Sequence, residues 1–207
     1  MPAPSAGVVA VAFKAPLLAR ILDPERKTRR EVVLDLGAAS QPMIDQLSLT
    51  FPGRIEVADL HGCGAITLLN AQEDRPGQAD TSLVESALPQ PNDELLDLVL
   101  CWDLPNYLTV PALCRLFDVV ARRAAPGCRV HMLITYSRRE MFPQPARYFP
   151  GADGQLKQVG SGDRFVAAPR YSPEELNRAV GNFRYQRGVL LANGMQEFVY
   201  AWPGSQA

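Results

Sequence analysis

The chain has 207 residues, a net charge of −1 and a pI of about 6.1, which suits one domain with an elaboration. Such a balanced charge excludes a global field that would attract nucleic acid or an anionic membrane, so we expect neither partner. No apolar run is long enough to span a bilayer and neither end carries a signal peptide, which predicts a cytoplasmic protein. The four cysteines form no Cys-x-x-Cys pair, and with only two histidines they predict buried, reduced thiols and no metal site.

The first third of the chain predicts a helical leader followed by a strand and a helix. Residues 1–30 are expected to form an N-terminal leader, in which Ala15–Arg30 is helical with one apolar stripe. The short apolar run Val32–Leu36 predicts a first strand that is buried on both faces. Ser40 is a candidate N-cap for the next helix, and Pro42 suits its first turn.

Strands and helices continue to alternate through the middle of the chain. We predict a second strand over Arg54–Asp59, a third over Thr81–Val84, a fourth over Asp97–Trp102 and a fifth over Cys128–Thr135. A helix opened by Thr109 separates the last two strands. This order is typical of parallel sheets joined by crossover helices.

Residues 136–170 interrupt the alternation with prolines, glycines, arginines and aromatic residues. A long irregular segment that follows a central strand is commonly functional, which predicts a lid-like insertion contacting a small-molecule acceptor or a protein partner. The alternative is a loop whose arginines are simply solvated and whose aromatic residues pin it to the body.

The C-terminal part predicts a helix and then a hairpin. Ser172 begins a capping box, and Asn193-Gly194 lies between the strands Phe183–Leu191 and Met195–Trp202. A two-residue link cannot join parallel neighbours, so the last strand must be antiparallel. Residues 31–207 therefore predict an α/β, Rossmann-like open sheet of about seven strands, mostly parallel with an antiparallel C-terminal hairpin strand, and with helices on both faces.

Several segments, in this order, resemble the class I S-adenosylmethionine (SAM)-dependent methyltransferase family over roughly residues 30–202. Val33-Leu34-Asp35-Leu36-Gly37 looks like the first motif of the family, and Leu96–Leu104 resembles its fourth-strand segment. Ala125–Val130 is similar to the turn into the fifth strand, and Ser172–Leu176 to the helix before the sixth.

The resemblance implies methyl transfer from SAM to a small acceptor by in-line displacement, with positioning as the main source of catalysis. Asp59 corresponds to the acid that holds the cofactor ribose, and Glu85 is the nearest candidate for the acid of the third strand. Asp103 and Tyr107 are predicted to handle an acceptor proton, although Asp103 could instead cap the next helix. The full set of implied cofactor contacts is Asp35, Gly37, Ala39, Ser40, Asp59, Leu60, Glu85, Cys101 and Trp102.

The chain departs from the family in its first motif. Gly37 stands alone, Ala39 occupies a position where a glycine is expected, and Pro42 removes a backbone donor. Two functions therefore stay open: a SAM-dependent methyltransferase acting on a small molecule, and a catalytically inactive methyltransferase-fold protein serving as a binding or regulatory module, either of them a possible homodimer. A nicotinamide dehydrogenase is a weaker alternative, because the chain lacks a Gly-x-Gly-x-x-Gly run.

Overall fold

A six-stranded mixed sheet forms the centre of the molecule in the computed structural model, which describes residues 8–23, 29–38, 40–72, 80–151, 155–161, 164–169 and 171–204. The strand order is β10-β11-β5-β4-β2-β3. The strands are β2 (Val32–Asp35), β3 (Arg54–Val57), β4 (Leu96–Trp102), β5 (Ala124–Thr135), β10 (Arg184–Leu190) and β11 (Met195–Ala201). β3, β2, β4 and β5 are parallel to one another, whereas β11 is antiparallel to both β5 and β10, which confirms the predicted hairpin return.

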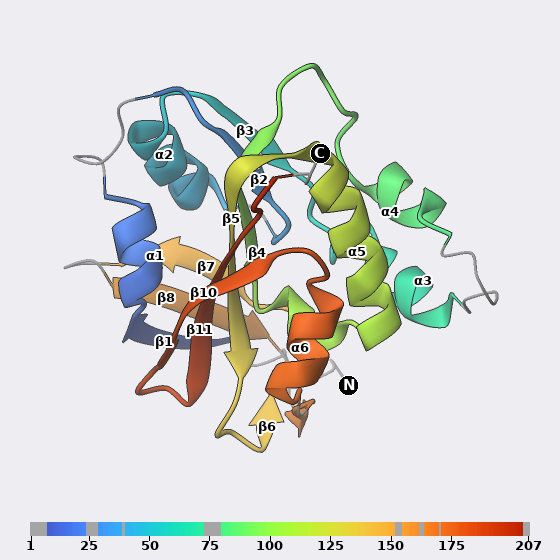
Figure 1. Cartoon of the computed structure of the whole chain (residues 1–207). Helices are drawn as coiled ribbons and strands as arrows, with labels where there is room; N and C mark the ends of the chain where they lie inside the picture. Colours follow the sequence, from blue (N-terminus) through green and yellow to red (C-terminus); the bar gives the residue numbers. More distant parts are fainter. Residues whose placement is uncertain are drawn as a thin grey trace, which may run out of the picture.

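Helices cover both faces of this sheet, as predicted (Figure 1). One face carries α3 (Ala65–Ala71), α4 (Ser82–Ala87), α5 (Val110–Arg123) and α6 (Pro173–Ala179), and the other carries α1 (Pro16–Ile21) and α2 (Gln41–Thr50). Side chains alternate between the two cores along β4: Cys101 joins the first, and Leu100 and Trp102 join the second. No described helix is both long and apolar enough to cross a membrane.

The third predicted strand was wrong, because residues 82–87 form helix α4. Only Val84 in this helix is fully buried, while Ser82, Glu85 and Ser86 face solvent, a spacing that suits one turn of helix over the core. Among the described strands, β3 is therefore the last on its side of the sheet. The predicted helix over Ala15–Arg30 is also shorter, since α1 ends at Ile21; residues 24–28 lie outside the described ranges.

The insertion is built from short strands that pair with the start of the chain. β1 (Val8–Lys14) runs antiparallel to β8 (Gln155–Ser161) along its whole length, and β7 (Arg147–Pro150) lies on the other side of β8. β6 (Glu140–Met141) and β9 (Val166–Ala167) form a second small pair. The three-stranded sheet packs on the same core as α1 and α2, through Phe13, Tyr148 and Leu156.

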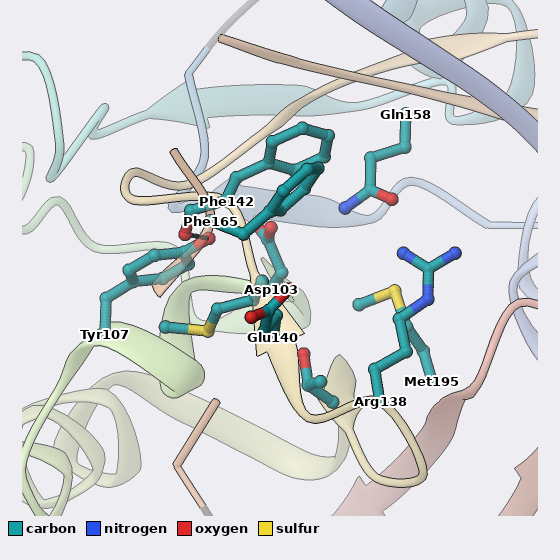
Figure 2. Close-up of a pocket in the computed structure, with 10 residues that line it drawn as sticks. Asp103, Tyr107, Arg138, Glu140, Phe142, Gln158, Phe165 and Met195 are labelled. Carbon is teal, nitrogen blue, oxygen red and sulfur yellow. Dashed lines mark hydrogen bonds between the residues drawn. The ribbon is translucent and has the colours of Figure 1, made fainter. Parts of the chain in front are cut away.

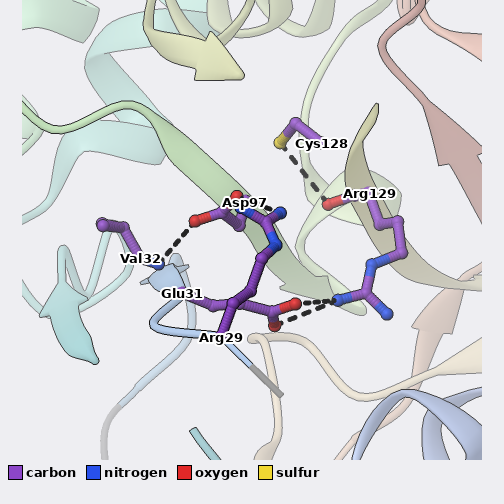
Figure 3. Close-up of polar contacts among 6 residues, drawn as sticks. All are labelled: Arg29, Glu31, Val32, Asp97, Cys128 and Arg129. Atoms are coloured by element: carbon purple, nitrogen blue, oxygen red, sulfur yellow. Dashed lines mark hydrogen bonds and ion pairs between the residues drawn. The ribbon is translucent and has the colours of Figure 1, made fainter. Parts of the chain in front are cut away.

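Polar contacts fix the register of the central strands at their amino-terminal ends (Figure 3). The Asp97 carboxylate on β4 accepts hydrogen bonds from the Val32 backbone N–H at 2.9 Å and from Arg29 Nη2 at 2.6 Å. Arg129 on β5 pairs with Glu31 at 3.2 Å. These contacts tie β2 to β4 and β5, and leave the carboxyl ends of the strands as the edge where a ligand would bind.

Glu197 on β11 anchors helix α1 from inside the core. Its carboxylate is fully buried and accepts hydrogen bonds from the backbone N–H groups of Leu17 at 2.9 Å and Leu18 at 2.7 Å. The third contact is His131 Nε2 on β5, 2.9 Å from Oε1. Because a carboxylate only accepts, this ring nitrogen carries the hydrogen. The contacts join α1, β5 and β11 at a single buried charge.

Candidate binding site at the carboxyl ends of the strands

Asp35 ends β2 at the expected crevice, but its carboxylate bonds to groups of its own chain. Oδ1 accepts hydrogen bonds from Trp102 Nε1 at 2.6 Å and from the Gly37 backbone N–H at 2.9 Å. Burial raises the pKa of Asp35 to about 6; the two hydrogen bonds act against burial, and the charge of Asp59 adds to it. The acid of the first motif therefore serves to hold the Trp102 indole.

Trp102 lies directly on Gly37. A Cβ added to Gly37 would stand 2.4 Å from Trp102 Cδ1, so only glycine fits beneath the ring. On its other side the indole stacks on Tyr148 of the insertion, with ring centroids 5.0 Å apart and an interplanar angle of 10°. Trp102 reaches this position with a φ of +51°, a conformation that is rare for a large side chain and strains the backbone.

The next predicted cofactor residues also have structural partners. Ser40 precedes α2, but its hydroxyl donates to the Tyr148 carbonyl at 3.1 Å instead of capping the helix. The Asp59 carboxylate accepts from the Gly62 backbone N–H at 2.8 Å and is partly exposed, with a φ of +39°. Leu60 is fully buried in the core, and Ala39 lies outside the described residues.

Glu85 and Cys101 lie away from Trp102. Glu85 is on the solvent side of α4, where it pairs with Arg122 at 3.0 Å and accepts from the Thr81 hydroxyl. Cys101 is fully buried in the core on the opposite face of β4, and burial raises the pKa of its thiol well above its ordinary value. The crevice thus brings together Asp35, Gly37 and Trp102, with Asp59 close enough to affect Asp35.

Asp103 and Tyr107, the two predicted proton-handling residues, both hold the insertion in place. Asp103 Oδ2 accepts a hydrogen bond from the Ala146 backbone N–H at 3.2 Å, and its side chain does not cap η2 (Leu104–Tyr107). The Tyr107 hydroxyl lies 3.1 Å from the Phe142 carbonyl and 2.9 Å from the Gln144 carbonyl. Burial, and then the charge of Asp103, raise the pKa of Tyr107 above its ordinary value, so its hydroxyl is a donor at neutral pH.

A small recess lies between Asp103 and the insertion (Figure 2). Its cavity volume is about 10 Å³, which admits one water-sized group. Asp103 and Gln158 are 3% and 4% exposed, and within the described part of the chain Asp103 Oδ1 and Gln158 Oε1 have no hydrogen-bond partner. The lining residues are Asp103, Tyr107, Thr135, Arg138, Glu140, Met141, Phe142, Gln158, Phe165 and Met195.

Gln158 was missed in the sequence because residues 136–170 were expected to be irregular. The structure shows the two-residue period of a strand, with Leu156, Gln158 and Gly160 buried and Lys157 exposed, but the sequence does not show it, because Gln158 is polar and Val159 apolar. A polar residue on the buried face of such a strand predicts a partner or a ligand.

The two buried carboxyls give the stability of the protein a defined pH dependence. Burial raises the pKa of Asp103 to about 7 and that of Asp35 to about 6, from an ordinary value of 3.8. The folded state therefore binds protons more tightly than the unfolded state, and this contribution to stability is full below about pH 4 and is lost as the pH rises to about 7.

We expect Asp103→Asn to gain stability relative to the wild type by on the order of 2 kcal/mol as the pH rises from about 4 to about 7, measured by urea denaturation. Asp35→Asn should gain stability over a narrower range, from about pH 4 to about pH 6. The contributions of the other titrating groups cancel when the free energy of unfolding of the wild type is subtracted from that of each variant. A difference in the free energy of unfolding between variant and wild type that does not change with pH would contradict the raised pKa values.

No family model and no curated protein matches the chain. Among solved structures, a SAM-dependent methyltransferase from Clostridium acetobutylicum is 12% identical with a TM-score of 0.53, over 91% of this chain and 89% of that one. The N-methyltransferase NodS from Bradyrhizobium japonicum, solved with S-adenosylhomocysteine (SAH), is 14% identical with a TM-score of 0.51, over 91% and 85%. The pyocyanin biosynthetic protein PhzM is 17% identical with a TM-score of 0.48; the chain spans only 53% of its length, with 89% of this chain covered.

The likenesses to the Clostridium methyltransferase and to NodS, with the sheet order and the antiparallel last strand, establish the fold. The chain has the Rossmann-like fold of class I SAM-dependent methyltransferases. At these identities the comparison concerns the fold alone.

Proposed function

We propose that this chain is a small-molecule-binding protein on the methyltransferase fold, with its cofactor crevice filled by its own side chains and no methyl transfer. The observation that carries this proposal is the position of Trp102, which lies against Gly37 where a ligand would approach the backbone. A regulatory module, the other inactive role left open by the sequence, is compatible with the same observation.

Opening the crevice would cost several interactions at once. The Trp102–Asp35 hydrogen bond involves a group that can be charged, and such bonds contribute about 1.5–3 kcal/mol. The stack on Tyr148 adds about 0.5–1.5 kcal/mol. Because Tyr148 belongs to β7, moving it also disturbs the sheet that covers this face. A cofactor would have to offset all of these losses.

A second candidate is a SAM-dependent methyltransferase acting on a small acceptor. It is favoured by the strained backbone of Trp102, because strain of this kind is stored at sites that change conformation. The acids Asp35 and Asp59 also stand at the ends of adjacent strands, where the family resemblance expects them. In this candidate Trp102 and Tyr148 would turn away when SAM binds.

Calorimetric titration with SAM and SAH tests the proposal against the second candidate. We expect no binding by the wild type at millimolar ligand, with circular dichroism confirming that the sample is folded. Asp59→Ala provides the control, since its carboxylate is partly exposed and its loss should leave the fold intact. Micromolar binding that disappears in Asp59→Ala would overturn the proposal and establish use of the crevice.

A further inference from the structure

A surface groove continues outward from the recess beneath the insertion. The groove has a volume of about 520 Å³ and runs between β1 and the β6–β9 pair. It shares Arg138, Glu140, Phe142 and Phe165 with the recess, so the two form one site with an open outer part and a narrow inner end. The outer part is lined by Val9, Val11, Arg138, Arg139, Glu140, Phe142 and Phe165.

The inner end of this site holds two unsatisfied acceptors, although the hydroxyls of Tyr107 and Thr135 and the guanidinium of Arg138 also line it. Asp103 Oδ1 and Gln158 Oε1 are buried acceptors without a partner in the described structure. The remaining atoms of both groups are engaged, because Asp103 Oδ2 accepts from Ala146 and Gln158 Nε2 donates to Tyr148 at 3.1 Å. A buried acceptor without a donor costs about 1–3 kcal/mol, so a ligand that supplies N–H groups would be bound favourably.

The charges and the walls define the rest of the ligand. Glu140 adds a second carboxyl to the lining of the recess, and Tyr107 and Phe142 add aromatic rings, whose faces attract cations. Figure 2 shows Arg138 on the side of the recess opposite Tyr107. Arg138 and Arg139 are exposed, and no ion pair to a described carboxylate neutralises either one. These two arginines outweigh the single carboxyl of Glu140 in the lining of the outer part, and its net positive charge favours an anionic group.

We propose that this site binds a small aromatic amine that carries a carboxylate at its far end. The ammonium group enters the recess and donates to Asp103 and Gln158, the ring lies against Phe142 and Phe165, and the carboxylate meets Arg138 and Arg139. This inference deepens the proposed function, because it names the ligand class of the insertion site. It is tested without SAM, so the two can fail separately.

Three probes separate the parts of the site in calorimetric titrations of the full chain. We expect 4-(aminomethyl)benzoate to bind at least about tenfold more tightly than benzylamine, and benzoate to bind more weakly than either. Absence of binding by both amines at millimolar concentration would overturn the proposal. Equal binding of benzoate and benzylamine would overturn the assignment of the amine to the recess.

Variants test each end of the ligand. Asp103→Asn keeps the shape and the acceptor for Ala146 but turns the free oxygen into a donor, so benzylamine affinity should fall at least about tenfold. Gln158→Leu should weaken benzylamine as well. Arg138→Gln should lower the affinity for 4-(aminomethyl)benzoate toward that for benzylamine, and leave the affinity for benzylamine unchanged. Glu85→Gln, on the surface of α4, is the matched control and should change none of these affinities.

Two further checks show whether a loss of binding comes from the site or from unfolding of the variant. Asp103 supports the insertion, so its variant is first checked by circular dichroism and by thermal unfolding. Amine binding that is the same in folded Asp103→Asn, in Gln158→Leu and in the wild type would overturn the site. A line of evidence independent of stability is the chemical shift of the Gln158 side-chain amide, which benzylamine should move and benzoate should not.

Discussion

Replacing Glu197 with alanine is expected to lower the free energy of unfolding by about 3–5 kcal/mol, as for the loss of one partner from a buried charged network. The variant removes the acceptor for two backbone N–H groups at the start of α1 and for His131 Nε2, all inside the core. Water could not replace the carboxylate as an acceptor for these donors, since the side chains of Glu197 and His131 are both fully buried.

Urea denaturation followed by circular dichroism measures this effect. Glu85→Ala is the matched control: it removes an exposed acid with one ion pair, and should cost less than about 1 kcal/mol. Glu197→Gln retains one acceptor oxygen, so its loss in free energy of unfolding should lie between those of Glu197→Ala and Glu85→Ala. A loss for Glu197→Ala as small as that of the control would show that α1 is not anchored through this carboxylate.

The second large effect is expected at Trp102, whose replacement by glycine should cost about 3–5 kcal/mol through loss of a buried aromatic ring. Relief of the positive φ should recover part of this loss. Gly37→Ala should cost about 1–3 kcal/mol in the wild type, because its Cβ collides with the indole. In the Trp102→Gly background the same change should cost less than about 0.5 kcal/mol.

Comparing the two backgrounds measures whether Trp102 fills the crevice. Gly188→Ala serves as a control for additivity: its Cβ would meet Phe198 at 3.2 Å on β11, at the other side of the sheet, so its cost should be equal in both backgrounds. A Gly37→Ala cost that does not depend on Trp102 would show that the indole lies elsewhere in solution, and would remove the observation on which the proposed function rests.

The central sheet could be predicted because its signals are local. Val32–Leu36 and Asp97–Trp102 are short apolar runs bounded by polar residues, and Asn193-Gly194 fixes the hairpin that sets the direction of β11. By contrast, Thr81–Val84 is too short for its periodicity to distinguish a strand from a helix. In the structure this segment belongs to helix α4.

The candidate site could be predicted only in part, because its decisive contacts join distant segments. Asp35 and Gly37 were placed correctly at the end of β2, but nothing in their own segment shows that Trp102 and Tyr148 cover them. Asp103 was predicted to handle an acceptor proton, but only the structure shows that β8 brings Gln158 to the same recess and that one oxygen of Asp103 has no partner there. A single sequence carries no information on such pairings.

The pairing of β1 with β8 has a consequence for synthesis of the chain. Lys14 pairs with Gln155 and Val8 with Ser161, so each contact closes a loop of more than a hundred residues. The apolar strand β1 leaves the ribosome well before β8, because β2, β3, β4 and β5 lie between the two in the chain. We therefore expect β1 to stay unpaired for longer than the strands of the central sheet, and to be the segment most exposed to chaperones in the meantime.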